Sequence, residues 1–196
     1  MIILGVTGGL ASGKSIISSH LKEKYKAYIF DADVEAKRLL HTKKVKKEIL
    51  DAFPEIKLLD NNTLARVAFK SKESQKKLNN IIHPHVDKEI EKRIFEKEGS
   101  HPFFVIDAAL IIESGSVNTF KNNGMTLLVV LADEHLRKER AELRGNLVEE
   151  TVLERMRLQL PDSEKIKYAD YVVKNNSTKS ELFQKIDKII AKINNE

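Results

Sequence analysis

The stretch that most constrains this chain is "GGLASGKS" at residues 8–15, which fits the pattern G-x-x-x-x-G-K-S. It follows an apolar run, "IILGV" at 2–6, and precedes a stretch with helical spacing. In that context glycines let the backbone approach an anion, and the first turn of the helix offers N–H groups to it. The sequence therefore predicts a strand, a phosphate-binding loop and a helix, rather than a glycine-rich turn with a coincidental lysine.

Each residue type in this loop has a chemical reason to be there. Successive backbone N–H groups are expected to form a concave nest around phosphate oxygens. The lysine would reach the β- and γ-phosphates, and the following serine would place its hydroxyl on Mg²⁺. The candidate phosphate-binding residues are Gly8, Gly9, Ala11, Ser12, Gly13, Lys14, Ser15 and Ile16, with Ser15 as the metal ligand.

Five short apolar runs predict the strands of one sheet. They are nearly continuous rather than alternating, which is typical of strands buried on both faces of a parallel sheet. Stretches with helical spacing separate them, so the fold class is α/β, with a five-stranded parallel sheet flanked by helices. The runs lie at residues 2–6, 27–30, 103–107, 126–131 and 171–173.

The uneven spacing of these runs predicts two insertions in a single domain. We expect a helical acceptor-binding insert at about 34–102 and an arginine-rich lid at about 133–168. The length is typical of a single domain. The predicted core consists of residues 1–33, 103–132 and 169–196.

Composition excludes several classes of protein. The net charge of +5, from 34 Lys and Arg against 29 Asp and Glu, suits an anionic small molecule and is too small to indicate nucleic acid. There is no cysteine, hence no disulfide framework. The start lacks a basic segment followed by a long apolar one, and the longest apolar run, 126–132, is too short to span a bilayer. We expect a soluble, cytoplasmic protein without a membrane partner, either a monomer or a weak homo-oligomer.

Carboxylates follow two of the predicted strands. Asp31 and Asp33 could hold Mg²⁺-bound water or take a proton from an acceptor hydroxyl. Asp33 could instead cap a helix that begins near Val34, and the two roles can coexist. Asp107 ends the third run, where it could contact metal or acceptor or simply occupy a turn. Glu113 lies six residues further on and is a weaker candidate of the same kind.

The lid contains arginines at spacings of three and four. Arg137, Arg140 and Arg144 would share one face of a helix. Such a face could stabilise charge on a transferring phosphoryl group and exclude water. The alternative is a solvated helix whose arginines pair with Glu139 and Glu142.

Two histidines flank a proline in "IIHPHVD". His83 and His85 could bind metal, but no third ligand is near in sequence. The segment could also be a turn that starts a helix, because proline is tolerated at the first helical position. A contact with the acceptor is the third possibility.

Taken in order, several motifs resemble the dephospho-coenzyme A kinase family over nearly the whole chain. The resemblance implies transfer of the γ-phosphoryl group of ATP, with Mg²⁺, to the ribose 3′-hydroxyl of dephospho-coenzyme A. That reaction is the last step of coenzyme A synthesis. The motifs are "GVTGGLASGKS" at 5–15, "DAD" at 31–33, "IIHPHV" at 81–86, "VIDAALIIE" at 105–113, Arg140 with Arg144, "RMRLQ" at 155–159 and "ADYVVKN" at 169–175.

The resemblance also implies roles for single residues. By position, Asp33 resembles the general base and Arg140 the lid arginine near the transferring phosphate, with Arg144 beside the donor. Thr7, His83 and Asp107 would contact the acceptor. Asn175 would lie near the adenine pocket.

Two departures from the family pattern stand out. The pattern D-x-P-L-L is replaced by Asp107-Ala108-Ala109-Leu110-Ile111, which puts the shape of the acceptor-side loop in doubt. Arg144 is followed by Gly145 instead of aspartate, which could loosen the lid. Alternative functions are another small-molecule kinase, such as a nucleoside-monophosphate kinase, or a GTPase-like switch. The chain lacks the N-K-x-D stretch that the switch requires.

Overall fold

The computed structural model describes residues 1–57, 59–68, 71–143, 153 and 156–195. The strands are β1 (Ile2–Gly8), β2 (Tyr28–Asp31), β3 (Phe103–Asp107), β4 (Thr126–Leu131) and β5 (Tyr171–Lys174). The helices are α1 (Lys14–Tyr25), α2 (Ala32–Leu39), α3 (Lys43–Ala52), α4 (Asn61–Ala68), α5 (Lys72–Lys97), α6 (Ser116–Asn122), α7 (Glu134–Leu143), α9 (Asp162–Ile166) and α10 (Lys179–Ile193).

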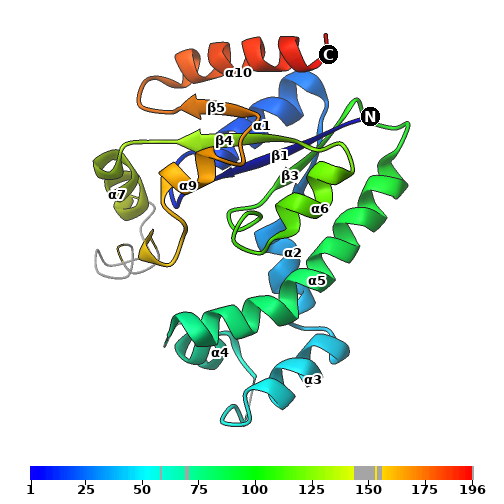
Figure 1. Ribbon diagram of the computed structural model, residues 1–196, viewed down its shortest axis with the longest axis vertical. Helices are drawn as coiled ribbons and strands as arrows, with labels where there is room; N and C mark the ends of the chain where they lie inside the picture. The colour runs from blue at the N-terminus through cyan, green and yellow to red at the C-terminus, as the bar shows by residue number, and fades with distance from the viewer. Residues whose placement is uncertain (58, 69–70, 144–152, 154–155, 196) are drawn as a thin grey trace. The chain divides into compact units, whose positions relative to one another are not determined.

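The strands form one sheet in the order β2-β3-β1-β4-β5 (Figure 1). β1 pairs in parallel with β3 and with β4, and β4 pairs in parallel with β5. The predicted α/β fold with five strands is confirmed. Because β1 is central, the loop at its carboxyl end lies between the ends of β3 and β4, where ligands bind in sheets of this class.

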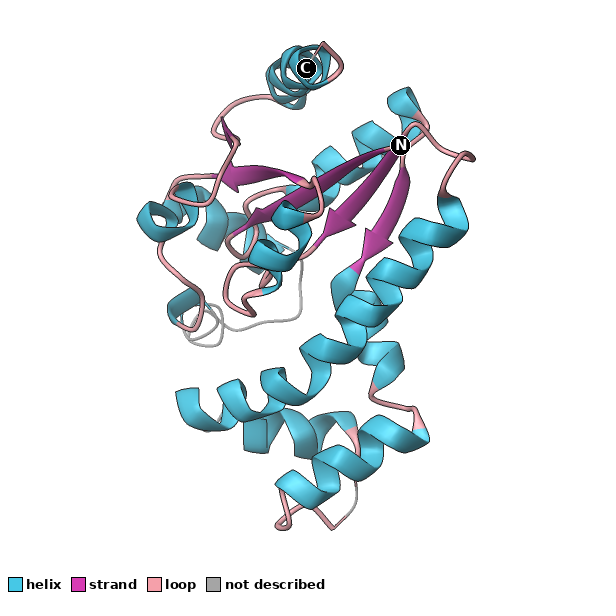
Figure 2. Cartoon of the chain, turned by 45° about the vertical axis from the view of Figure 1, so that its right-hand side comes forward, coloured by secondary structure: helices cyan, strands magenta, loops and turns pink. Residues whose placement is uncertain are grey.

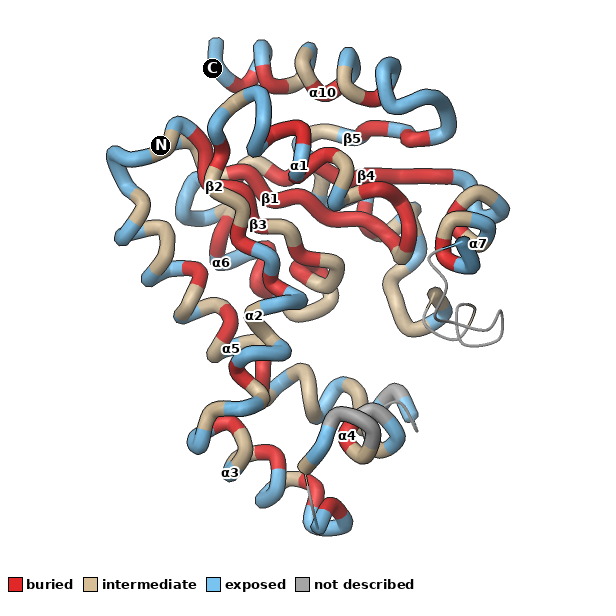
Figure 3. Tube along the Cα trace, turned by 180° about the vertical axis from the view of Figure 1, so that it is seen from behind, coloured by how far each residue is buried: buried red, intermediate tan, exposed pale blue. Residues whose placement is uncertain are grey.

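Helices α1 and α10 cover one face of the sheet. Leu4 and Val6 of β1 pack in one apolar cluster with Ile17 of α1 and Ile186 of α10, and all four are fully buried. The central strands are buried along almost their whole length (Figure 3). The strands are apolar along nearly their whole length because both faces of a parallel sheet are covered.

The chain divides into two compact units. The first contains Met1–Phe30 and Lys97–Glu196, and the second contains Asp31–Glu96. The second unit is made of helices and their connections (Figure 2). Its buried side chains include Val45, Ile49 and Phe53 around α3 and Ile82, Val86 and Ile90 of α5.

Helix α5 runs without interruption from Lys72 to Lys97 and contains Pro84. The expectation of a turn that starts a helix at His83–His85 is therefore wrong. Proline removes one hydrogen bond to the preceding turn. Ile82, Val86 and Ile90 are nevertheless all buried, at helical spacing, and this burial favours a continuous helix. Among the described residues, no helix combines the length and the apolar character that crossing a membrane requires.

Candidate active site

The phosphate loop connects β1 to α1, as the sequence predicts. Gly13 precedes the first residue of α1 with a φ of 104°, a conformation that side chains other than glycine rarely adopt. A Cβ at this position would also lie 2.1 Å from Nδ2 of Asn175. Lys14 donates from Nζ to the carbonyl oxygens of Gly8 at 3.1 Å and Gly9 at 3.4 Å. Its side chain therefore folds back along the loop.

The middle of the loop contains buried donors that no group in the described part of the chain uses. Ala11, Ser12 and Gly13 are all buried. Within the described parts of the chain, the N–H groups of Ala11 and Gly13 donate to no protein acceptor, and Oγ of Ser12 has no hydrogen-bond partner. Buried donors that stay unsatisfied are costly. A loop of this kind fits an anion such as a phosphate group.

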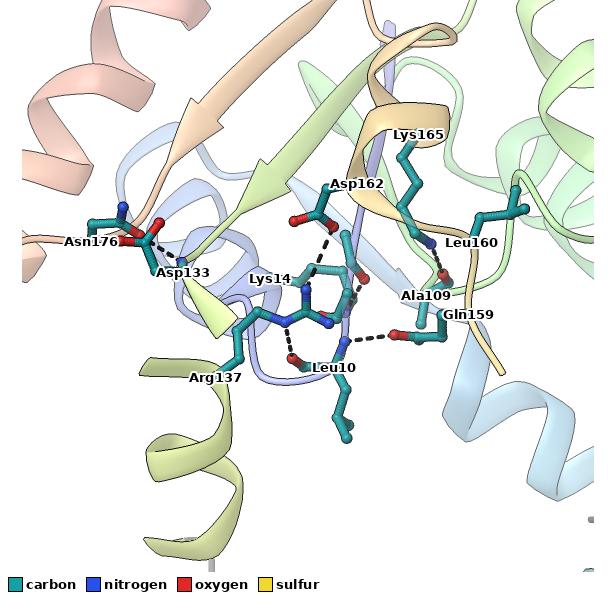
Figure 4. A network of polar contacts seen from close by, with 12 residues as sticks. Leu10, Lys14, Ala109, Asp133, Arg137, Gln159, Leu160, Asp162, Lys165 and Asn176 are labelled. Carbon is teal, nitrogen blue, oxygen red and sulfur yellow. Dashed lines mark hydrogen bonds and ion pairs between the residues drawn. The ribbon is translucent and has the colours of Figure 1, made fainter. Parts of the chain in front are cut away.

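Three side chains from distant segments bind the loop at its other peptide groups, and Figure 4 shows two of them, Arg137 and Gln159, at Leu10. Gln159 accepts from the N–H of Leu10 at 2.7 Å, and Nε of Arg137 donates to the carbonyl of Leu10 at 2.9 Å. Nδ2 of Asn175 donates to the carbonyl of Ser12 at 2.8 Å. Asp162 pairs with the guanidinium of Arg137 at 3.5 Å.

Arg137 and Arg140 of α7 have partners other than those of a solvated helix. Arg137 is only 8% exposed, and Nη2 of Arg140 donates to the main-chain oxygen of Asn175 at 3.0 Å. The alternative of a solvated helix, in which these two arginines pair with Glu139 and Glu142, is therefore wrong. Nη1 of Arg140 is buried and, among the described residues, has no hydrogen-bond partner. Arg144 lies outside the described residues.

The carboxyl end of β3 lies beside that of β1. Asp107 is opposite Val6 in the strand register, and its carboxylate accepts from Oγ of Ser18 at 2.7 Å. Thr7 is buried and donates weakly to the carbonyl of Ala109 at 3.4 Å. The structure therefore places Thr7 and Asp107 at the same edge of the sheet as the phosphate loop.

Glu113 lies in the turn that follows β3 and forms a buried ion pair with Lys165. Their Oε1 and Nζ atoms are 2.5 Å apart, and Lys165 is fully buried. Oε1 also accepts from the N–H of Leu160 at 3.0 Å. Nζ of Lys165 lies 3.5 Å from the carbonyl of Ala109, where the family pattern has proline. This pair joins the loop after β3 to the segment that ends the lid.

In the second unit, Asp31 caps α2 by accepting from the N–H of Val34 at 2.9 Å. The expectation that Asp33 caps this helix is therefore wrong, because α2 begins two residues earlier than Val34. Asp33 is exposed in the first turn of α2, two residues after the end of β2.

The two histidines of α5 have different surroundings. Nε2 of His85 lies 2.7 Å from Oε2 of Glu48, and this hydrogen bond lowers the pKa of the Glu48 carboxyl. His83 is half-buried. Among the described residues, no group of three or more His, Asp or Glu side chains could hold a metal ion.

Gln159, Asp162 and Lys165 are site residues that sequence reasoning missed. Gln159 stands in a quoted motif, "RMRLQ", but nothing local indicates that its amide reaches residue 10. Asp162 and Lys165 lie in "PDSEKIKYAD", which resembles an ordinary charged surface helix. Only a pairing across the fold distinguishes them.

The chain is similar to known kinases over nearly its whole length. The family model described as "Dephospho-CoA kinase" matches residues 2–181. A dephospho-CoA kinase of Fusobacterium nucleatum is 37% identical, with 96% of each chain covered. Two solved structures are also similar. One is TT1252 from Thermus thermophilus, with a TM-score of 0.79, 29% identity and 97% of each chain covered. The other is a dephospho-CoA kinase from Campylobacter jejuni, with a TM-score of 0.66, 26% identity, and 97% of this chain and 96% of the other covered.

Proposed function

Since the chain belongs to the dephospho-CoA kinase family, and so transfers the γ-phosphoryl group of ATP to dephospho-coenzyme A, we propose that residues 8–15 hold the ATP phosphates. The observation that carries this assignment is the set of unused buried donors in the loop, the N–H groups of Ala11 and Gly13 and the hydroxyl of Ser12. Lys14 starts the helix at the end of the same loop, so its ammonium and the helix dipole act on one anion. Gly8, Gly9, Ser15 and Ile16 complete the proposed contact set.

We propose Mg²⁺ as the metal of the reaction, with the hydroxyl of Ser15 as its protein ligand. Ser15 is exposed in the first turn of α1, directly after Lys14. Mg²⁺ in kinases is held mostly by water and nucleotide phosphates, with only one or two protein ligands. When bound, it would neutralise charge on the β- and γ-phosphate oxygens.

The residues proposed for the acceptor side are those whose positions resemble the family's acceptor contacts and general base. We assign Asp33 as the residue that orients the 3′-hydroxyl and receives its proton as oxygen attacks the γ-phosphorus and the bond to ADP breaks. Its carboxylate is exposed and is not the helix cap, so capping does not compete with this role. Thr7, His83 and Asp107 are the proposed acceptor contacts, and the acceptor-binding insert at about 34–102 stays a prediction.

On the lid side, Arg140 is proposed to meet the charge that develops on the transferring phosphoryl group. Its buried Nη1, which has no partner among the described residues, supports this role. Arg144 is proposed to assist it. Asn175 stays a candidate for the nucleotide site, with its side-chain amide on the phosphate loop. A cytoplasmic location and a monomer or weak homo-oligomer remain predictions.

The test is ADP release with dephospho-coenzyme A against a panel of nucleosides, nucleoside monophosphates and sugars. With ATP as the donor, we expect turnover of dephospho-coenzyme A and of no other acceptor in the panel. Asp33→Asn should reduce kcat by roughly 10²- to 10⁴-fold, the range of a lost general base. Asp31→Asn is the matched control, because asparagine caps a helix as well as aspartate does. Similar activity in wild type and Asp33→Asn would rule out Asp33 as the general base. Turnover of another acceptor in place of dephospho-coenzyme A would show that the assigned substrate is wrong.

A further inference from the structure

We propose that Arg137 and Asn175 are positioning residues that turn two N–H groups of the phosphate loop toward ATP. This inference rests on the proposed donor role of residues 8–15. Neither side chain needs to contact the nucleotide. Each binds one loop carbonyl from outside and so fixes the direction of the next N–H group.

The argument follows from the planarity of the peptide bond. In a trans peptide the C=O and N–H groups point to opposite sides of the chain. No described peptide bond is cis. Nε of Arg137 binds the carbonyl of Leu10 at 2.9 Å, so the N–H of Ala11 points away from the guanidinium. Nδ2 of Asn175 binds the carbonyl of Ser12 at 2.8 Å, so the N–H of Gly13 points away from the amide. Both N–H groups belong to buried residues, and neither donates to a described protein acceptor.

The backbone between the two held carbonyls is strained. Ala11 has a φ of 58°, in the left-handed region that residues with a Cβ disfavour. Such a conformation persists only where its surroundings fix it. The carbonyls of Leu10 and Ser12, on either side of Ala11, are both held by side chains from distant segments. Without these two hydrogen bonds, we expect Ala11 to leave the left-handed conformation in which its N–H group faces the anion site.

Arg137 is itself held in place. It is 8% exposed and pairs with Asp162 at 3.5 Å. Its guanidinium lies against Gly9, where a Cβ would stand 2.2 Å from Nη2. The N–H of Leu10 is taken by Gln159 at 2.7 Å, so both polar groups of Leu10 are fixed (Figure 4).

Asn175 is equally well fixed and connects the loop to the lid. Its main-chain N–H donates to Leu131 at 2.8 Å, and its main-chain oxygen accepts from Arg140 at 3.0 Å. The residue that orients the N–H of Gly13 therefore also holds the proposed lid arginine.

The experiment compares Arg137→Met with Arg137→Gln. Both remove the charge, but only glutamine can still donate to the carbonyl of Leu10. The measurements are KM for ATP, KM for dephospho-coenzyme A and the Kd of inorganic tripolyphosphate. Arg137→Met should raise the ATP KM and the tripolyphosphate Kd by roughly tenfold, with the other KM unchanged. Arg137→Gln should recover most of that loss, and Asn175→Ala should resemble Arg137→Met.

Gly9→Ala is a second way to remove the hydrogen bond from Arg137 to Leu10, because the added methyl group would displace the guanidinium. Alone it should weaken tripolyphosphate binding, and added to Arg137→Ala it should change little. Equal losses in Arg137→Gln and Arg137→Met would show that the charge matters instead, and would overturn the inference. Equal increases in both KM values with a lower Tm would also overturn it, in favour of a structural role. A Lys14→Met enzyme that binds tripolyphosphate normally would overturn the donor role of the loop itself.

Discussion

Two polar regions of the first unit use their hydrogen bonds in opposite ways. On the helical face, Asp187 of α10 accepts from Tyr25 at 2.7 Å and from Lys24 at 2.8 Å, and Nε2 of His20 lies 2.8 Å from it. Both carboxylate oxygens are used. At the phosphate loop, buried N–H groups and a hydroxyl have no protein partner among the described residues. We therefore expect the first region to stabilise the fold and the second to bind a ligand.

The pKa values of the Asp187 cluster, which is Asp187 with His20, Lys24 and Tyr25, reflect this saturation. Burial alone would raise the pKa of Asp187, but hydrogen bonds from Lys24, His20 and Tyr25 outweigh it and lower the pKa to about 2. Burial, with the hydrogen bond to Asp187, raises the pKa of Tyr25 to about 12. His20 also stacks on Phe183, with 4.0 Å between ring centroids. The comparison predicts that changes at the loop affect activity, whereas changes in this cluster affect stability.

The largest effect is expected at the loop. Lys14→Met removes the ammonium from the proposed phosphate site and should reduce kcat/KM by roughly 10³-fold, or about 4 kcal/mol of transition-state stabilisation. The Tm should change little, because Lys14 is only half-buried. Steady-state kinetics and a thermal melt on the same sample check this. A large decrease in Tm with activity retained would show that the loop, like the Asp187 cluster, mainly stabilises the fold.

The Glu113–Lys165 pair combines features of both regions. It lies at the same edge of the sheet as the phosphate loop, but it is buried, as a pair that stabilises the fold would be. Lys165→Met leaves a buried carboxylate without its counter-ion, and should lower the free energy of unfolding by about 3 kcal/mol. Urea unfolding measures the loss. The double variant Glu113→Gln/Lys165→Met should be more stable than Lys165→Met alone. If the two are equally stable, the cost does not come from the unpaired charge.

A smaller effect is expected for Asp187→Asn, about 1.5 kcal/mol at neutral pH, from the lost charge-assisted hydrogen bonds. Because the folded pKa of Asp187 is about 2 against an ordinary 3.8, its stabilisation is present above about pH 4 and lost as the pH falls toward 2. The unfolding free energies of wild type and variant should therefore converge in acid. A constant difference down to pH 2 would contradict this, as would a large loss of activity in the variant.

The smallest effect is expected for Tyr25→Phe, about 1 kcal/mol, because only one neutral donor is lost. The pKa of Tyr25 is raised from 10.0 to about 12, so its contribution is present below pH 10 and lost as the pH rises through about 12. Unfolding measured from pH 8 to 11.5 should show a shallower alkaline decline in the variant than in wild type. Identical declines would assign the loss of stability to other groups.

The sequence by itself determined the parts of this protein that depend on neighbouring residues. The glycine-rich loop, the helix that begins at Lys14 and the five apolar strands follow from local backbone geometry and from the period of the side chains. Local patterns were less reliable where two residues compete for one position. Asp31, not Asp33, became the helix cap, and Pro84 did not interrupt α5.

Only the tertiary structure decided which side chains hold the phosphate loop. Gln159 is 149 positions from Leu10, and Asn175 is 163 positions from Ser12, yet each forms a direct hydrogen bond. The same holds for Lys165, which reads as a surface lysine and is fully buried against Glu113. Such pairs depend on strand order and register, which bring the ends of β1, β3 and β4 together, and no local pattern contains that information. The sequence therefore identified the loop that we propose binds phosphate, and the fold supplied the side chains that hold this loop.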